Sequence, residues 1–559
     1  MSLSAIINAG QSALIAAQTQ MSVASTNITN ASTEGYTTKT ASTATTTVSG
    51  QAVGVAVTAI GNQISAALQA EVMSAASEAR YDETLAAYLE TALTALGTTS
   101  SGAPLEEAMT ALSDALAEAV SDGGTTSATA AVADALAVWA ETLNTTAADL
   151  EAVARTVESD LAKSVDSVNA LLQTLDTLND QITAATAAGR STADLLDSQR
   201  SALEELSGYL DIASYTASSG DLYIYSADGQ ALLTSTPRTL SYDAAGGIAI
   251  DGEDVGTKLG GGSIGALLEL HDTVLPGLQD ELDSLAVTVM EAVNAAANAA
   301  SPVPAPATLT SAGTLDAAAA FAGSGTLAVL LTDGDGVVTG SAEIDLAGLS
   351  TYQDLVDALD AVSGVSASLD GDGRLTLAAD DGTSGLVLAG DGTVDADGRS
   401  LAHHLGVNSL LQGSGAADMA VAESLETQGV PLAQAAATAT GETALVAGDT
   451  TGLQALWTSV DTEQDFPASG ALAATEATPI TRIASLIDSL ADRTATASDT
   501  AEASAAMLEA LATSFDNTYG VNVDEETAKL VVLEQSYESA AQILATAQEM
   551  FDSLIAMMQ

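Results

Sequence analysis

Several short motifs of the chain contain residues that could do chemistry, and the first of them is rich in glycine. The stretch GGGSIG at 260–265 satisfies the G-x-G-x-x-G pattern of dinucleotide-binding turns, and Asp283 follows at about the spacing of the acid that binds the ribose. Such a turn also needs a buried strand before it, and the preceding AIDGEDVGTKL is too polar for a central strand. We therefore expect a simple turn into a helix and no nucleotide cofactor, with an NAD-binding enzyme as an alternative.

A second motif, DGDG, occurs at 333–336 and at 370–373 and resembles the start of a calcium-binding loop. Such a loop needs oxygen ligands at its first, third and fifth positions. Val337 and Arg374 stand at the fifth position, where neither can bind calcium. Since Asp-Gly pairs supply the positive φ that tight turns require, we expect a hairpin turn at each site.

Residues for catalysis or metal binding are scarce. The only histidines are His271, His403 and His404, and the chain contains no cysteine. Two adjacent histidines without a third clustered ligand do not define a metal site. We expect no metal, no cofactor and no catalytic centre, so the chain is predicted not to be an enzyme.

The stretch STNITNASTEGYTTKT at 25–40 contains two formal glycosylation sequons, which begin at Asn27 and Asn30. It also follows a strongly periodic apolar segment. Asn, Ser, Thr and Gly supply turn geometry and local backbone hydrogen bonds. We therefore interpret the stretch as the joint at which a helix ends and the chain changes direction.

The charge balance excludes some classes of partner. The chain has 74 Asp and Glu but 13 Lys and Arg, which gives a formal net charge of −61. A surface of this kind repels phosphate backbones and anionic lipids, so neither nucleic acid nor a membrane is expected as a partner. No apolar run reaches the roughly 18 residues of a membrane span. The N-terminal segment lacks the basic region of a signal peptide, so we expect a protein that either stays inside or is exported without processing.

Both ends of the chain carry a heptad pattern of apolar residues. Each predicts a long helix with a seam along one face. The N-terminal seam is Leu3, Ile7, Gly10, Leu14, Ala17, Met21, Ala24 and Ile28; the C-terminal seam is Leu530, Leu533, Tyr537, Ala540, Leu544, Ala547, Phe551, Leu554 and Met558. Asp524 is the predicted N-cap of the second helix. The two helices either pack on a globular core or pair with each other and with neighbouring chains.

The segments between these helices predict a multidomain α + β fold. Helical patterns dominate 61–215, and one seam comprises Leu161, Val165, Val168, Leu172, Leu175 and Ile182. A β-hairpin is expected near 220–235 with Asp228-Gly229 as its turn, and a long helix with a possible kink at Pro276 follows. The Pro-rich SPVPAPATL at 301–309 begins a β-rich insert, in which one helix starts with a Ser350–Gln353 capping box.

Three domains are predicted from this order, with boundaries uncertain by about 15 residues. They are a terminal coiled-coil domain of 1–33 and 524–559, a mainly helical body of 34–300 and 476–523, and a β-rich insert of 301–475.

The stretch at 25–40 resembles the Ser-Asn-Asn-Ile-Ala-Asn, Thr-Pro-Gly-Tyr motif of the rod, hook and hook-associated axial proteins of bacterial flagella. Thr26 replaces the second Asn of that motif and Glu34 replaces its Pro. The matching residues are Ser25, Asn27, Ile28, Asn30, Thr33, Gly35 and Tyr36. The C-terminal segment is similar to the end segment of the same group at Asp524, Glu525, Glu526, Leu530, Gln535, Tyr537, Ala541 and Phe551.

Interior segments narrow the resemblance to one branch of that family. VDSVNALLQTLDTLNDQI, ADLLDSQRSALEELS, GGGSIGALLELHDTVLPGLQDELDSLA and LAHHLGVNSLLQGSGAADMAV resemble blocks of the hook-associated protein 1 family, the first hook–filament junction proteins. The resemblance implies a structural role: a ring of identical subunits at the hook–filament junction, located outside the cell. It also implies contacts with hook protein, with the second junction protein or flagellin, and with an export chaperone and the flagellar type III export apparatus.

The same resemblance implies which residues take part in assembly. Leu3, Ile7, Leu14, Met21 and Ile28 would form the N-terminal interface, and Ser25, Asn27, Asn30, Thr33, Gly35 and Tyr36 the hinge. Asp524, Glu525, Leu530, Leu533, Tyr537, Leu544, Phe551 and Leu554 would form the C-terminal interface. A hook or distal-rod protein of the same family and a secreted adhesin-like surface protein remain as alternatives.

Overall fold

A computed structural model describes residues 3–33, 35–48, 51–62, 64–97, 102–217, 220–245, 247–255, 259–394 and 399–558. The chain forms two compact units. The first unit comprises 1–88, 156–270 and 495–559, and the second comprises 89–155 and 271–494. The fold is a mixed, multidomain α + β fold with long helices and several small sheets, as the sequence predicts. The predicted division into three domains stays a prediction.

The helices are α1 (Leu3–Thr29), α2 (Ala66–Leu96), α3 (Pro104–Ser121), α4 (Thr126–Ala187), α5 (Ala193–Tyr209), α6 (Gly262–Glu269), α7 (Leu275–Asn298), α8 (Tyr352–Asp360), α9 (Leu401–Leu405), α10 (Glu423–Gln428), α11 (Thr451–Asp461), α12 (Pro479–Tyr519) and α13 (Val523–Met558). The strands of the first unit are β1 (Thr40–Val48), β2 (Gln51–Gly61), β3 (Ile212–Thr216), β4 (Leu222–Ser226), β5 (Ala231–Leu233), β6 (Leu240–Asp243), β7 (Gly247–Ile250) and β8 (Glu253–Asp254).

The strands of the second unit are β9 (Thr308–Thr314), β10 (Gly323–Ser324), β11 (Thr326–Thr332), β12 (Val338–Asp345), β13 (Val365–Leu369), β14 (Arg374–Ala379), β15 (Gly385–Gly390), β16 (Thr393–Val394), β17 (Arg399–Ser400), β18 (Leu411–Gln412), β19 (Ala420–Val421), β20 (Gln464–Phe466) and β21 (Thr475–Ala477).

Helix α4 organises the small sheets of the first unit. All six residues of its predicted seam are buried, which confirms the helical period. On the same helix, Asn179 donates to Leu222 O and accepts from Leu222 N, each at 3.0 Å. Asn169 makes the same pair of bonds with the backbone of Leu240 at 2.8 Å. Each amide therefore attaches one strand to the helix, and the predicted hairpin is present as antiparallel β4 and β5.

The glycine motif is a turn into a helix, as expected. Gly261 caps α6 with φ of 75°, and Gly262 has φ of 58°. A Cβ on Gly262 would lie 2.2 Å from the carbonyl carbon of Tyr209, so backbone contact explains this glycine. Residues 256–258 of the preceding stretch lie outside the described residues. The long helix predicted to follow is interrupted by a π-helical turn at Leu270–Val274, directly before Pro276.

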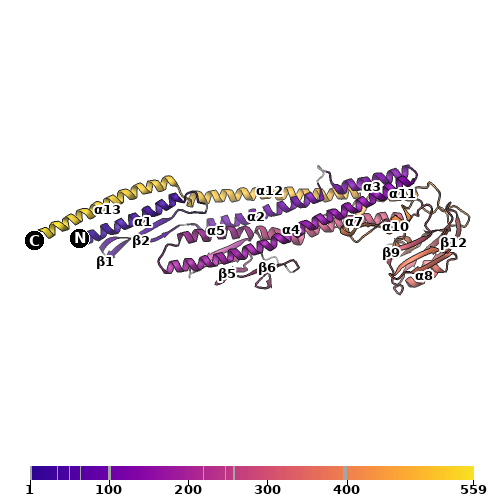
Figure 1. Cartoon of the computed structure of the whole chain (residues 1–559), viewed down its shortest axis with the longest axis horizontal. Helices are drawn as coiled ribbons and strands as arrows, with labels where there is room; N and C mark the ends of the chain where they lie inside the picture. The colour runs from indigo at the N-terminus through magenta and orange to yellow at the C-terminus, as the bar shows by residue number, and fades with distance from the viewer. Residues whose placement is uncertain are drawn as a thin grey trace. The chain divides into compact units, whose positions relative to one another are not determined.

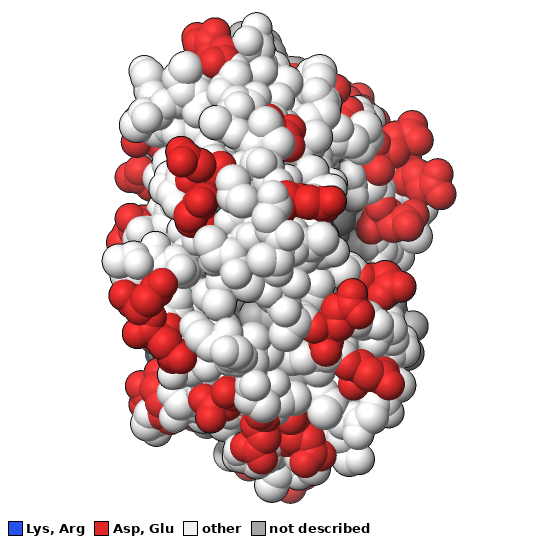
Figure 2. All heavy atoms as spheres, turned by 90° about the vertical axis from the view of Figure 1, so that its right-hand side faces the viewer, with Lys and Arg blue, Asp and Glu red and all other residues white. Residues whose placement is uncertain are grey.

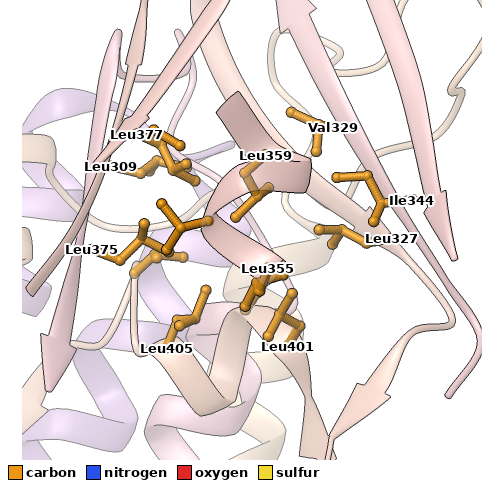
Figure 3. Packing of buried hydrophobic residues seen from close by; sticks show 14 of the residues in the cluster. Leu309, Leu327, Val329, Ile344, Leu355, Leu359, Leu375, Leu377, Leu401 and Leu405 are labelled. Carbon is orange, nitrogen blue, oxygen red and sulfur yellow. The ribbon is translucent and has the colours of Figure 1, made fainter. Parts of the chain in front are cut away.

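In the second unit, two three-stranded sheets enclose α8. Their orders are β12-β11-β15 and β13-β14-β9, with antiparallel pairing throughout. Leu355 and Leu359 of α8 lie between Leu309 and Leu377 of one sheet and Val329 of the other (Figure 3). This apolar cluster is the core of the predicted insert.

Local turns of the second unit confirm one prediction and correct another. Both DGDG stretches are hairpin turns: Asp333 accepts from the N–H of Val337 and Asp370 from that of Arg374, each at 2.9 Å. The capping box of α8 lies one residue later than predicted, at Thr351 and Asp354. Ser350 donates its N–H to Asp354, so it lies outside the cap.

Glu281 of α7 and Arg482 of α12 are both 2% exposed and together hold the loop at 467–473. Glu281 Oε1 accepts from the N–H of Ala471 at 2.5 Å and of Leu472 at 3.2 Å. Arg482 donates to the carbonyl oxygens of Ala473 and Pro467. Burial raises the pKa of Glu281 above its ordinary value near 4.5, although these hydrogen bonds and the charge of Arg482 oppose the rise.

This burial predicts how acidity affects the stability of the second unit. Because the folded-state pKa is raised, the folded chain binds the proton of Glu281 more tightly, and the stability contribution of this group falls as pH rises from about 4.5 through the folded pKa. Glu281→Gln keeps the acceptor oxygen and removes the titration. We expect the wild type to lose stability relative to Glu281→Gln as pH rises above about 4.5, measured by hydrogen exchange of 467–473. Exposed Glu463→Gln is the control, and equal pH profiles for wild type and Glu281→Gln would contradict the prediction.

Candidate assembly interface

The two terminal helices, α1 and α13, pack side by side within the first unit (Figure 1). The most deeply buried seam residues are small. They are Gly10, Ala17 and Ala24 of α1 and Ala540 and Ala547 of α13, each spaced by seven residues. At Gly10 the backbones approach closely, because an added Cβ would lie 3.5 Å from Leu544 Cδ1 and 3.7 Å from Ala540 O. The small residues therefore let the two helices approach closely, but they bury little apolar surface.

The large residues predicted for the N-terminal interface are only half-buried in this pair. These residues are Leu3, Ile7, Leu14, Met21 and Ile28. Of the C-terminal set, Leu530, Leu533 and Leu544 are half-buried, whereas Tyr537, Phe551, Leu554, Asp524 and Glu525 are exposed. The structure thus places the predicted residues on one helix pair, but the pairing of α1 with α13 does not cover most of them.

Helix α13 carries a further exposed apolar set, which we call the α13 apolar strip. It comprises Val531, Val532, Ile543, Met550, Phe551, Leu554, Ile555 and Met557, whose exposed fractions are 43–78%. A groove of about 660 Å³ lies along the helix pair between Leu3, Ile6, Ile543 and Met550. Exposed apolar side chains beside such a groove are a candidate interaction site.

The joint after α1 is built around Asn27, whose side chain is fully buried. Its Nδ2 donates to Lys39 O and to Glu526 Oε2, both at 2.9 Å. Its Oδ1 accepts from Tyr36 Oη at 2.9 Å and from Lys39 N at 3.1 Å. One amide therefore connects the end of α1, the outgoing chain and the first turn of α13. Since Asn27 Nδ2 is buried and bonded, the first sequon is a structural element of the joint.

Lys39 carries the positive charge of the joint and is 6% exposed. Its ammonium pairs with Asp194 of α5 and lies 3.5 Å from Asp197 Oδ2 and 4.2 Å from the Tyr36 ring centroid. Burial acts to lower the pKa of Lys39, but the hydrogen bond to Asp194 and the neighbouring charges outweigh it and raise this pKa. The ammonium is thus charged at neutral pH, and the stability that it contributes is lost as pH rises through the raised pKa.

The chain between Gly35 and Thr38 is fixed to α5 and to the end of α12. Gly35 has φ of 72°, and its carbonyl accepts from Arg200. Thr37 Oγ1 donates to Asp197 Oδ1 at 2.7 Å, and Thr38 donates its N–H to Tyr519 O at 2.8 Å. The outgoing chain is therefore held on two helices of the first unit.

The other predicted hinge residues contribute less. Ser25 is exposed, Asn30 donates to Thr26 O at 2.9 Å, and Thr33 donates to Asn30 Oδ1 at 3.3 Å. These bonds close the last turn of α1. Glu34, which replaces the proline of the motif, lies outside the described residues.

The predicted N-cap of α13 was wrong by two residues. Asn522 Oδ1 accepts from the N–H groups of Asp524 at 3.1 Å and Glu525 at 3.2 Å, so Asn522 is the cap. Asp524 and Glu525 lie in the first helical turn, where their charges favour the positive end of the helix dipole.

Sequence reasoning did not predict that Asp194, Asp197, Arg200 and Glu526 belong to the joint. Asp197 and Arg200 are buried, and Glu526 is 3% exposed. One signal was present: Lys39 is the only basic residue before Arg80, so its charge needed an acidic partner. Which of the 74 acids supplies that partner is set by packing alone.

The described ranges lack the features of a metal site and of a membrane-spanning helix. Within them, no group of three or more His, Cys, Asp or Glu side chains is placed to hold a metal ion. A membrane-spanning helix is likewise not found among the described residues.

Family comparisons agree with the parts of the chain just described. Residues 7–37, which comprise most of α1 and the joint, match the model of the flagella basal body rod protein. Residues 512–557 match the C-terminal model of the flagellar basal body rod FlgEFG protein. The chain is therefore an axial protein of the bacterial flagellum.

The segment between these ends identifies the branch. Residues 90–301 match the helical domain of the flagellar hook-associated protein FlgK, and the chain belongs to the FlgK-type hook-associated proteins. This family is a structural component of the flagellum and not an enzyme family.

A solved structure is also similar to the chain. The flagellar hook junction protein FlgK from Burkholderia pseudomallei aligns with 15% identity and a TM-score of 0.49, over 80% of this chain and 99% of that chain. No curated protein matches the chain.

The central position of Asn27 leads to a prediction. Asn27→Ala removes four hydrogen bonds and leaves the backbone N–H and carbonyl of buried Lys39, Glu526 Oε2 and the hydroxyl of half-buried Tyr36 without that partner. Each unsatisfied buried polar group costs about 1–3 kcal/mol, so we expect α1 and 35–39 to lose at least about 2 kcal/mol of protection in native-state hydrogen exchange. Asn30→Ala is the matched control, because Asn30 bonds only within the exposed end of α1, and its effect should stay within about 0.5 kcal/mol. Equal losses in both variants would contradict the central role of Asn27.

Proposed function

We propose that the chain forms the junction ring that joins the flagellar hook to the filament. The observation that carries the proposal is the α13 apolar strip beside the α1–α13 pair. Burying a large apolar side chain gains about 1.5–3 kcal/mol, and within one copy these side chains remain exposed. Neighbouring copies that bring their own α1–α13 pairs together would bury them.

The proposal extends to the organisation of the ring. The terminal helices would form its inner layer, the helical body its outer layer, and the β-rich insert would face solvent. Asn27 and Lys39 would fix the direction in which the chain leaves the inner layer. Asn27 bonds both to α13 and to the outgoing chain, and Lys39 of the outgoing chain pairs with α5. The residues of the two predicted interfaces and of the hinge are proposed to act in these contacts.

Neighbours and location follow from the same role. Hook protein would lie on one axial side of the ring, and the second junction protein or flagellin on the other. Copies would reach this extracellular position through the flagellar type III export apparatus with the help of an export chaperone. The match of 90–301 to a hook-associated helical domain supports a junction role over a hook or distal-rod role.

A deletion strain tests the junction role directly. Without the junction ring, flagellin has no platform for polymerisation, so we expect hooks without filaments and unpolymerised flagellin in the medium. Electron microscopy and immunoblots of the culture supernatant measure both results, and a strain complemented with the full chain is the control. Normal filaments in the deletion strain would overturn the proposal.

The α13 apolar strip predicts a separable effect on assembly. Ile543→Ser and Met550→Ser together remove two large side chains that are 52% and 53% exposed, so the isolated copy should keep its helical content. Assembly should weaken at least tenfold in subunit concentration, measured by sedimentation, since tenfold corresponds to about 1.4 kcal/mol. Met507→Ser on α12 is the matched control, because Met507 is 59% exposed and lies outside the strip. Unchanged assembly of the double variant would exclude the strip as the contact surface.

A further inference from the structure

The first part of the chain is nearly free of charge, although the whole chain is strongly acidic. Residues 1–70 contain only two charged residues, Glu34 and Lys39, and none occurs between Thr40 and Ala70. At the average charged fraction of 16%, that stretch of 31 residues would hold about five. By contrast, the face of the molecule in Figure 2 shows Asp and Glu and no Lys or Arg among the described residues drawn there.

The neutral stretch folds into the antiparallel hairpin of β1 and β2, which sequence reasoning did not predict. Strand β2 rests on α1: Ser12 Oγ accepts from Val55 N at 3.1 Å, and a Cβ on Gly54 would lie 2.4 Å from that oxygen. Strand β1 is the outer strand, and Ser42 to Thr47 are all exposed. One side of the hairpin is therefore supported by α1, while the other side is open.

Strand β1 has an unprotected edge. It pairs with β2 only, among the strands in the described ranges. The segment Thr43–Thr46 lies in regular register between two register shifts and consists of β-forming or small residues. Natural proteins blunt such edges with Lys, Pro or a covering element, and β1 contains neither Lys nor Pro. This strand is suited to pair with a strand edge of another chain.

The first unit also has an open strand edge that lies in a groove. In the pairing of β3 with β4, Ala217 N donates to Asp221 O and Ala227 N donates to Asp211 O. Because antiparallel pairs bond at alternate residues, the backbone groups of Ile212, Ser214 and Thr216 point away from β4. A groove of about 420 Å³ lies along that edge. Among the described residues that line it, which come mainly from α2, α5 and β3, there is no Asp or Glu.

We propose that the β1 edge of one copy pairs with the β3 edge of a neighbouring copy in the groove beside α5. This inference rests on the proposed ring, because it requires copies to be neighbours. A ring needs two different contact surfaces on each copy, and β1 and β3 are such a pair. Two strands of this length add several backbone hydrogen bonds without any new side-chain charge.

The charge of the chain indicates which partner suits the β1 edge and the groove beside β3. Two copies with formal charges of −61 repel each other wherever carboxylates face carboxylates. The neutral β1 strand and the groove without carboxylates can approach within the screening distance of about 8 Å at physiological salt without that cost. A cationic partner would gain more on the acidic surfaces elsewhere, so the neutral strand and the groove, whose one charged lining residue among those described is Arg200, suit a second copy of this chain.

The absence of cysteine allows a direct test of this contact. Copies carrying Ala44→Cys are mixed with copies carrying Thr216→Cys and allowed to assemble under mild oxidation. A disulfide between different copies then appears as a dimer on a non-reducing gel. We expect dimers in at least fivefold excess over a mixture of Ala44→Cys with the exposed control Thr177→Cys on α4. Equal dimer yields in the two mixtures would overturn the proposal.

A charge variant gives an independent readout. Thr45→Asp places a carboxylate on the exposed β1 strand, whereas Thr45→Asn is a polar control without charge. Thr45→Asp should raise the concentration needed for assembly at least fivefold, with partial recovery at about 1 M salt, and Thr45→Asn should stay within twofold. Hydrogen exchange of 40–48 should slow on assembly of the wild type. If wild-type copies assemble without that slowing, the strand pairing is wrong; if they do not assemble at all, the proposed ring is wrong.

Discussion

The side-chain amide of Asn27 is the interaction on which the arrangement of the terminal helices depends. An amide has two donors and an acceptor oxygen with two lone pairs, and here two donor bonds and two acceptor bonds are made to Tyr36 and Lys39 of the outgoing chain and to Glu526 of α13. Because the site is fully buried, water cannot replace a missing partner. The end of α1, the strand that leaves it and the start of α13 must therefore adopt one arrangement together.

This constraint matters because the seam between α1 and α13 is weak in itself. Gly10, Ala17, Ala24, Ala540 and Ala547 permit close packing but remove little apolar area from water. The hydrogen bonds of the joint fix the relative orientation of the two helices at one end of the pair, since hydrogen bonds are directional and apolar contact is not. The larger side chains remain on the outside of α13. The pair is thus held in register by a few polar contacts, and its apolar surface is left for contacts with other chains.

Sequence periodicity predicted the parts of the fold in which one face is buried along a single element. The N-terminal helix and the α4 seam are of this kind, because heptads report burial directly. The β1–β2 hairpin was not predicted, since its Thr-rich outer strand is exposed and shows no alternation. The joint was predicted only for the residues that directly follow the N-terminal helix, and its partners on α5 and α13 were not predicted. Lys39 and Asp194 are 155 residues apart, and no local pattern indicates which distant carboxylate a buried ammonium will bind.

The distribution of charge connects the fold to the role of an axial protein. A uniformly acidic surface would make every contact between identical copies repulsive, whereas an entirely neutral surface would permit association at any point. This chain separates the two properties: patches of carboxylates are spread over the face drawn in Figure 2, and charge is nearly absent from residues 1–70, which include α1 and the hairpin. In the proposed ring, repulsion would oppose contacts that bring carboxylates together more strongly than contacts between the neutral segments. Electrostatics would thereby contribute to specificity in the proposed ring without any ion pair between subunits.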